Sequence, residues 1–291
     1  MATPPRPSPG LRALLVAALL LGAAAGAPAP AAPPPSSRAV TPAETAREAL
    51  AARDVPFERH AFLAAAADGD VELVALFLDA GMPAAARDAH GNSALLEAAR
   101  NDHVEVLRRL LARGAKPGDA PGGEPPLVVA AEAGSLRALE ALLSAGADPG
   151  QPADPARGPG GTALQRALAA ESWEAARLLV EAGASPAAVA PPLPPPLALA
   201  AESGHAPSVA LLLGRGADPN GRAAGGLAPL RAAAWNGHAE AVRLLLLAGA
   251  DAKTDRAALL AGRPGQPLAP EVRKLLLHPP KPESKAAKPA R

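Results

Sequence analysis

The chain has 291 residues, of which 49% are hydrophobic but only 2% are aromatic, and it contains neither tyrosine nor cysteine. So few aromatic rings argue against a compact core built around them, and the lack of cysteine excludes a disulfide framework, a thiolate metal site and lipid attachment at a cysteine. The 29 basic and 28 acidic residues leave a formal net charge of +1, which gives no indication of nucleic-acid binding.

The N-terminal segment has the layout of a secretory signal peptide. Arg6 and Arg12 precede an uncharged apolar run, residues 13–27, that ends in small residues. A membrane-spanning helix normally needs about 20 apolar residues, so a cleaved signal fits better than a retained anchor. We predict a signal peptide over residues 1–25, with cleavage after Ala27 fitting almost equally well. The mature chain would then have no membrane span and be periplasmic or secreted.

The segment after the signal divides into a linker and a helix. Residues 26–40 are rich in alanine and proline and predict a disordered spacer. Thr41, Pro42 and Glu44 suit the N-cap, N1 and N3 positions of a helix. We predict a capping helix over residues 42–53 that covers the open edge of the domain that follows.

Six glycines recur at intervals of 33, 32, 37, 33 and 33 residues, each just after a short leucine-rich segment: Gly81, Gly114, Gly146, Gly183, Gly216 and Gly249. A glycine at the end of a helix is typical of a left-handed C′ cap, because glycine adopts positive φ without a steric penalty. The period therefore predicts a stack of equivalent helix-turn-helix units.

Each unit has one small-residue helix and one apolar helix. Paired alanines on the first helix allow neighbouring units to approach closely, and the second helix carries an apolar face for the next unit. In the second unit that face is predicted to be Val106, Leu107, Leu110 and Leu111. Glu105 and Arg109 lie four residues apart on the opposite side, where we expect an exposed ion pair.

The units resemble ankyrin repeats, whose pattern runs Thr-Pro-Leu-His, two alanines, Gly-His, an aliphatic helix and Gly-Ala-Asp. The sixth unit carries this resemblance in Ala228-Pro229-Leu230-Arg231, Ala232-Ala233, Gly237-His238 and Gly249-Ala250-Asp251. The resemblance covers residues 57–256 and implies an all-α fold, an ankyrin-repeat solenoid of about six helix-turn-helix repeats with short β-hairpin-like fingers and helical caps. The predicted domain spans residues 41–278.

Two fingers and the C-terminal end depart from the pattern. Residues 151–161 contain four extra residues, and Leu193 replaces a finger glycine within a proline-rich stretch that is either a rigid loop or a polyproline II ligand. A degenerate seventh repeat is predicted to form a C-terminal cap over residues 257–277. The basic tail, residues 279–291, indicates disorder or a weak electrostatic role.

No pattern of catalytic or metal-binding residues stands out among the six histidines. His103, His205 and His238 occupy the histidine of the Gly-His position, where the imidazole can bond backbone groups. No histidine pair has metal-ligand spacing on one helix, and nothing resembles a nucleophile elbow or a phosphate-binding loop. We predict no enzyme, no cofactor and no metal, although a Ser-His-Asp triad assembled in space stays open.

The resemblance implies that partners dock on the concave surface of fingers and first helices. The candidate partner-binding residues are Asp68, Arg87, Asp88, His90, Arg100, Asn101, Glu132, Glu202, Ser203, Trp235 and Asn236. Trp235 is predicted to be an exposed interface anchor, whereas Trp173 is predicted to pack in the core.

We therefore predict an exported, monomeric protein-interaction module that binds another protein of unknown identity. Three other interpretations stay open: a dedicated inhibitor or stabiliser of one exported enzyme, a hydrolase on a repeat scaffold, and a solvated surface without a partner.

Overall fold

The computed structural model describes residues 40–120, 123–156, 159–222, 228–253, 256–263 and 265–281. The predicted signal peptide, all of the predicted linker except residue 40, and residues 282–291 of the predicted tail lie outside this part of the chain. Residues from Pro42 onward form one compact unit. All of the helices described below belong to that unit.

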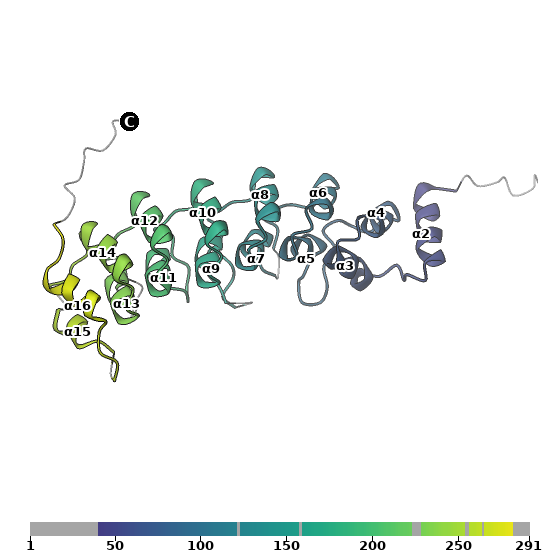
Figure 1. Ribbon diagram of the computed structural model, residues 1–291. Helices are drawn as coiled ribbons and strands as arrows, with labels where there is room; N and C mark the ends of the chain where they lie inside the picture. Colours follow the sequence, from purple (N-terminus) through teal and green to yellow (C-terminus); the bar gives the residue numbers. More distant parts are fainter. Residues whose placement is uncertain are drawn as a thin grey trace, which may run out of the picture. The chain divides into compact units, whose positions relative to one another are not determined.

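The described residues form fifteen α-helices and no strand beyond isolated bridges. Six of them are the first helices of the repeats: α3 (Arg59–Asp68), α5 (Ala94–Arg100), α7 (Pro126–Ala133), α9 (Ala163–Ala169), α11 (Pro196–Ser203) and α13 (Pro229–Trp235). Six more are the second helices: α4 (Val71–Asp79), α6 (Val104–Ala112), α8 (Leu136–Ser144), α10 (Trp173–Glu181), α12 (Ala206–Gly214) and α14 (Ala239–Leu247). Figure 1 shows the two sets as adjacent rows.

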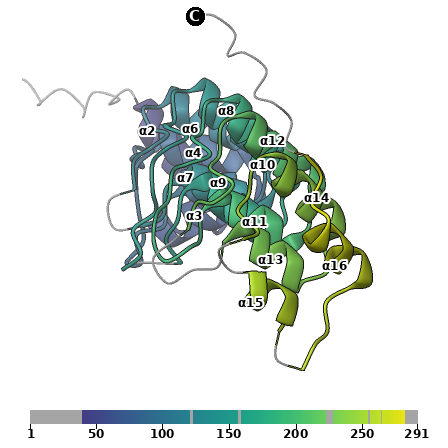
Figure 2. The same cartoon turned by 90° about the vertical axis from the view of Figure 1, so that its left-hand side faces the viewer.

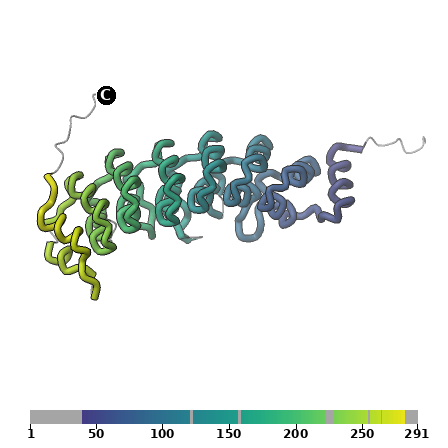
Figure 3. Tube along the Cα trace, viewed as in Figure 1, coloured from purple at the N-terminus to yellow at the C-terminus, as the bar shows by residue number. Residues whose placement is uncertain are grey.

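Each helix packs against its counterpart in the next repeat, first on first and second on second. The chain repeats the same helix-turn-helix path from α3 to α14 (Figure 3). In the rotated view of Figure 2 the second helices lie along one side of this stack and the loops between repeats along the other. Isolated antiparallel bridges, Arg87 with Ser93 and Pro152 with Thr162, mark two of those loops as hairpin-like fingers.

The predicted left-handed glycine caps are present. Gly114 has a φ of 90°, its N–H donates to the Leu111 carbonyl at 3.0 Å, and the Ala115 N–H donates to the Leu110 carbonyl at 3.1 Å. This pair of bonds is a Schellman motif, which satisfies carbonyls that the end of the helix would otherwise leave unbonded. The other five periodic glycines also have positive φ, so the same turn ends every second helix.

The predicted apolar face of the second unit needs one correction. Val106, Leu107 and Leu110 are fully buried, but Leu111 is only partly buried at the edge of the core. The expected ion pair is also shifted by one residue. Glu105 pairs with Arg108 at 2.8 Å and three residues' spacing, not with Arg109.

Further helices stand at both ends of the stack, one at the N-terminal end and two at the C-terminal end. At the N-terminal end α2 (Pro42–Ala52) packs on α4 and has the features of a second helix. Asp54 follows it with a φ of 57°, as Gly81 follows α4, and the Val55 N–H donates to the Leu50 carbonyl at 3.0 Å. The N-terminal cap is therefore the second half of a repeat.

The C-terminal end carries a shortened helix pair, α15 (Arg256–Ala261) and α16 (Pro270–Leu277). α15 contacts α13 and α16 contacts α14, which is the arrangement of one further repeat. Leu276 is buried, whereas Leu277 is 40% exposed. Leu276 therefore contributes to the apolar contact of this cap, together with Leu259 and Val272.

Candidate functional site

The predicted site residues lie on the first helices and in the fingers, but they are not equally accessible. Six are exposed: Asp68, His90, Arg100, Asn101, Glu132 and Glu202. Five are partly buried: Arg87, Asp88, Ser203, Trp235 and Asn236. The contacts below separate those that present a side chain to solvent from those that hold the fold.

Arg87 and Asp88 are engaged in holding a finger. The Arg87 guanidinium donates to the Gly91 carbonyl at 2.8 Å and to the Asp119 carbonyl in the next finger. The Asp88 carboxylate accepts from the Asn92 side chain and from the backbone N–H groups of Asn92 and His90. Burial raises the pKa of this carboxyl, but the hydrogen bonds outweigh it and hold the pKa below its usual range. Both residues therefore stabilise finger geometry.

Asn101 and Asn236 connect neighbouring repeats. The Asn101 amide donates to the Ala67 carbonyl at 3.2 Å, and the Asn236 amide donates to the Glu202 carbonyl at 3.0 Å. Each amide also donates to a carbonyl of its own helix. Arg100 remains at the surface and pairs with Glu97 on the same helix at 3.2 Å.

Side chains at the starts of the second helices donate to the preceding repeat. Histidine Nε2 atoms lie 2.8 Å from the Ala67 carbonyl, for His103, and 3.0 Å from the Glu202 carbonyl, for His238. Serine hydroxyls do the same in two other repeats: Ser135 to Arg100 at 2.7 Å and Ser172 to Glu132 at 3.2 Å. The prediction that His103 and His238 bond backbone groups is therefore confirmed.

The glycine beneath each of these two histidines leaves room for the ring. A Cβ atom at Gly69 would lie 2.6 Å from the His103 ring, and one at Gly204 would lie 2.3 Å from the His238 ring. Both distances are far below van der Waals contact, so a side chain at either position would displace the imidazole. The Gly-His pairing thus arises between repeats rather than within one.

His205 also bonds a backbone group, as predicted, but this group belongs to its own repeat and not to the preceding one. Its Nδ1 lies 2.8 Å from the Ser208 hydroxyl and accepts from the Ser208 N–H, so it caps its own helix, α12. Its ring stacks on Trp173 with centroids 4.2 Å apart and an interplanar angle of 7°. Burial lowers the pKa of this imidazole. Trp173 is accordingly partly buried against the core and the histidine.

Trp235 is partly buried rather than fully exposed. The Arg231 guanidinium lies over its indole ring, 5.5 Å from the centroid, and the indole Nε1 is buried without an acceptor among the described residues. The ring is therefore held against its own helix, which reduces the area that it can offer to a partner.

Two buried polar side chains of α9, those of Arg166 and Gln165, were not identified as important by the sequence analysis. Arg166, only 5% exposed, pairs with Glu124 at 3.1 Å and with Glu132. Gln165 is fully buried and donates to the Leu193 and Pro194 carbonyls of the proline-rich finger. The spacing of Thr162 and Gln165 is a capping-box signal that was available in the sequence, but nothing local indicated the pairing of Arg166.

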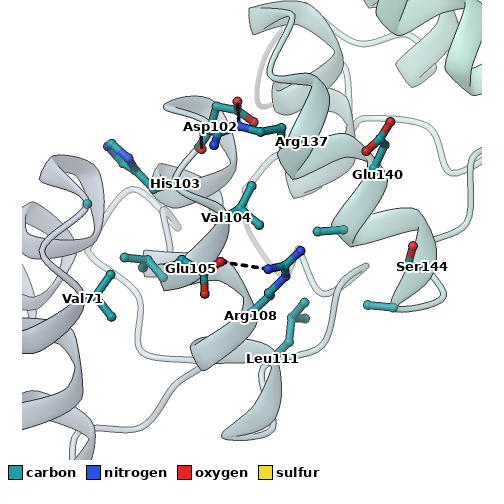
Figure 4. Close-up of a pocket in the computed structure, with 14 residues that line it drawn as sticks. Val71, Asp102, His103, Val104, Glu105, Arg108, Leu111, Arg137, Glu140 and Ser144 are labelled. Atoms are coloured by element: carbon teal, nitrogen blue, oxygen red, sulfur yellow. Dashed lines mark hydrogen bonds and ion pairs between the residues drawn. The ribbon is translucent and has the colours of Figure 1, made fainter.

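A groove of about 870 Å³ lies on the second-helix side, between α6 and α8. Figure 4 shows His103 and Ser144 at opposite ends of this groove, so they do not form a nucleophile–base pair there. Asp102 instead accepts from Arg137 Nε at 2.9 Å and from the Ala138 N–H at 2.7 Å. Its carboxylate is used to cap α8.

Comparison with known proteins agrees with this architecture, which is that of a helical repeat solenoid. A family model described as ankyrin repeats (3 copies) matches residues 43–121 and 193–256. A putative ankyrin repeat-containing protein of Treponema pallidum (strain Nichols) is 39% identical over 145 residues, which are 48% of this chain and 47% of the relative. The chain therefore spans about half the length of that relative.

The crystal structure of the human ASB11 ankyrin repeat domain superposes with a TM-score of 0.62 at 24% identity. The match covers 77% of this chain and 99% of the ASB11 domain. The chain contains ankyrin repeats, and its fold is an ankyrin-repeat solenoid. Ankyrin repeats indicate a scaffold for protein–protein interaction and are typically non-catalytic.

Among the described residues, no helix combines the length and hydropathy needed to cross a bilayer. In the same part of the chain, no three or more histidine, aspartate or glutamate side chains are grouped so that they could hold a metal ion.

Proposed function

We propose that the chain is an exported module that binds another protein through its fingers and first helices. One observation carries the proposal. The backbone carbonyls of Arg100, Glu132 and Glu202 accept hydrogen bonds from the following repeat, while the side chains of the same residues are exposed. A surface whose backbone is fixed loses little conformational entropy when a partner binds, which favours affinity.

Affinity capture with the full chain tests this proposal. The immobilised protein is exposed to the periplasmic extract of the organism that makes it. The same capture is repeated with an Asp68→Ala/Arg100→Ala variant, which changes exposed residues of first helices. The matched control is Arg109→Ala/Glu140→Ala, which changes exposed residues of second helices.

We expect the first variant to lose at least tenfold in retained partner, and the control to retain it. Equal capture by both variants would overturn the proposal. Recovery of a single enzyme in equimolar amount, with its activity reduced, would make the chain a dedicated inhibitor.

Export is the second part of the proposal and rests on Arg6, Arg12 and the apolar run after them. N-terminal sequencing of the protein from the soluble periplasm should give a chain that begins at Gly26 or Pro28. Recovery of the chain in the cytosol with Met1 intact would contradict export and leave the binding proposal unaffected.

A further inference from the structure

The junction between α9 and α11 departs from the other junctions between first helices. These two helices make the loosest contact of any neighbouring pair in that row. Two positions at the end of each first helix carry at least one larger side chain in the other repeats. At α9 these positions are Ala169, its last residue, and Ala170, its C-cap, and both are exposed. The side chains that could fill the space between the helices are therefore missing.

A hydrogen bond present at four other junctions is also missing here. The carbonyls of Ala67, Arg100, Glu132 and Glu202 each accept from a histidine or serine of the following repeat. Ala169 occupies the equivalent position on α9, and its carbonyl accepts no hydrogen bond within the described residues. The reason is that His205, which would supply the donor, caps α12 through Ser208.

The capping of α12 by His205 also leaves the carboxylate of Glu171 without its expected partner. Asp102 caps the helix of the next repeat by accepting from Arg137 and the Ala138 N–H. Glu171 occupies the equivalent position and has the same positive φ of 58°. Its carboxylate makes no hydrogen bond or ion pair within the described residues. Pro207 stands where Arg137 supplies its guanidinium and has no donor of its own, and His205 already accepts from the Ser208 N–H.

These features surround a hollow of about 580 Å³, which we call the α9–α11 hollow. Leu199 and Ala169 supply apolar lining, and Glu171 and Glu202 stand at its rim. Glu202, like Glu171, makes no side-chain ion pair within the described residues. Arg263 lies at the same opening but pairs with neither carboxylate there.

We propose that the α9–α11 hollow receives an arginine or lysine side chain of a protein partner. The proposal rests on the proposed function and specifies the partner's chemistry. A long basic side chain can place its methylene groups on the apolar lining and direct its charged head to the carboxylates of Glu171 and Glu202 and the carbonyl of Ala169. The carboxylates outnumber the cation Arg263, so the charge of the opening favours a cationic guest.

Selection of peptides from a random phage-displayed library, with the full chain as bait, tests this proposal. Selected peptides should be enriched in arginine or lysine, and replacing that residue by norleucine should weaken binding. Affinity should fall about tenfold in Glu171→Gln/Glu202→Gln, which removes the rim charges without changing their shape. Arg263→Gln should strengthen binding, because it removes the competing cation.

Two further variants separate the hollow from general electrostatics. Ala169→Met fills the hollow without changing charge and should abolish peptide binding, whereas Ala112→Met, at an exposed alanine of α6, should not. Glu140→Gln on α8 is the matched charge control and should leave the affinity unchanged.

Failure to enrich basic peptides, or affinity unaltered by Glu171→Gln/Glu202→Gln, would overturn the proposal. If the captured partner of the full chain is still retained by that double variant but lost by Asp68→Ala/Arg100→Ala, protein binding stands and only the hollow is excluded. If basic peptides bind only after residues 282–291 are removed, the chain's own basic tail is the occupant, and the proposal of a partner side chain is wrong.

Discussion

The junction between α3 and α5 and the junction between α9 and α11 use the same template with different results. At the first, His103 lies over Gly69 and donates to the Ala67 carbonyl. At the second, Glu171 occupies the position of that glycine, and His205 stacks on Trp173 and caps its own helix. A histidine at this position thus either connects two repeats or caps its own helix. The residues around it determine which of the two it does.

The comparison shows how a repeat protein acquires a distinct site without losing its fold. Stacking of the aliphatic second helices continues through both junctions, so stability near α9 and α11 does not depend on the missing histidine bond. The polar positions are then free to vary. The polar network and the looser contact between α9 and α11 therefore distinguish the two junctions.

The largest expected effect is on the core beside each junction. Leu110 on α6 and Leu179 on α10 occupy equivalent positions, and both are fully buried. Leu110→Ala should lower the free energy of unfolding by about 2–5 kcal/mol. Leu179→Ala should cost less, because looser surroundings can collapse into the cavity. Leu111→Ala, at a partly buried position, should lower the free energy of unfolding least of the three. Urea unfolding measures all of these changes. A larger loss for Leu179 would contradict the comparison.

The next effect concerns the buried cation of α9. Arg166→Ala should lower the unfolding free energy by about 2–3 kcal/mol, less than for a fully buried pair, because the Glu132 side chain stays 43% exposed. Arg177→Ala is the control. Its guanidinium is 44% exposed and pairs with Glu174 and Glu181, so its loss should cost much less than the loss of Arg166, because solvent screens exposed ion pairs. Thermal unfolding distinguishes them, and similar losses would show that Arg166 is more solvated than the structure indicates.

A smaller effect is expected from the histidine that connects repeats. His103→Ala removes a hydrogen bond to the Ala67 carbonyl and should cost about 1–2 kcal/mol. His103→Ser should recover part of this loss, because Ser135 and Ser172 make the equivalent bond in other repeats. Hydrogen exchange at the end of α3 provides the local measurement. Equal protection in the alanine and serine variants would show that ring packing, not the hydrogen bond, matters there.

Much of the architecture could be predicted from the sequence, because the period of the glycines and the spacing of the apolar residues are local signals that recur in every repeat. The side-chain contacts could not. Arg166 pairs with Glu132, which lies 34 residues earlier in the chain, and His205 stacks on Trp173 of the preceding repeat. Such pairs depend on which residues the stack places opposite each other. The partial burial of Trp235 has the same origin, because Arg231 lies one helical turn before it and covers its ring.

The smallest expected effect is a pH dependence of stability that arises from His205 at the α9–α11 junction. Burial lowers the pKa of His205 in the folded chain, whereas an unfolded histidine titrates near pH 6.5, as an approximate reference. Between these two values the unfolded state binds more protons, so stability rises with pH. The contribution of neutral His205 to the free energy of unfolding is fully present above about pH 6.5. It is lost as the pH falls toward the pKa of His205 in the folded chain.

A His205→Phe variant isolates this contribution. Phenylalanine keeps a ring against Trp173 but cannot titrate, so the variant should lack the part of the pH dependence that His205 supplies. Urea unfolding of the two chains at pH values from 7.5 downward measures the difference. The stability advantage of the wild type should shrink as the pH falls. A constant difference across that range would mean that His205 binds protons equally well in both states, and that its stack on Trp173 accommodates the imidazolium.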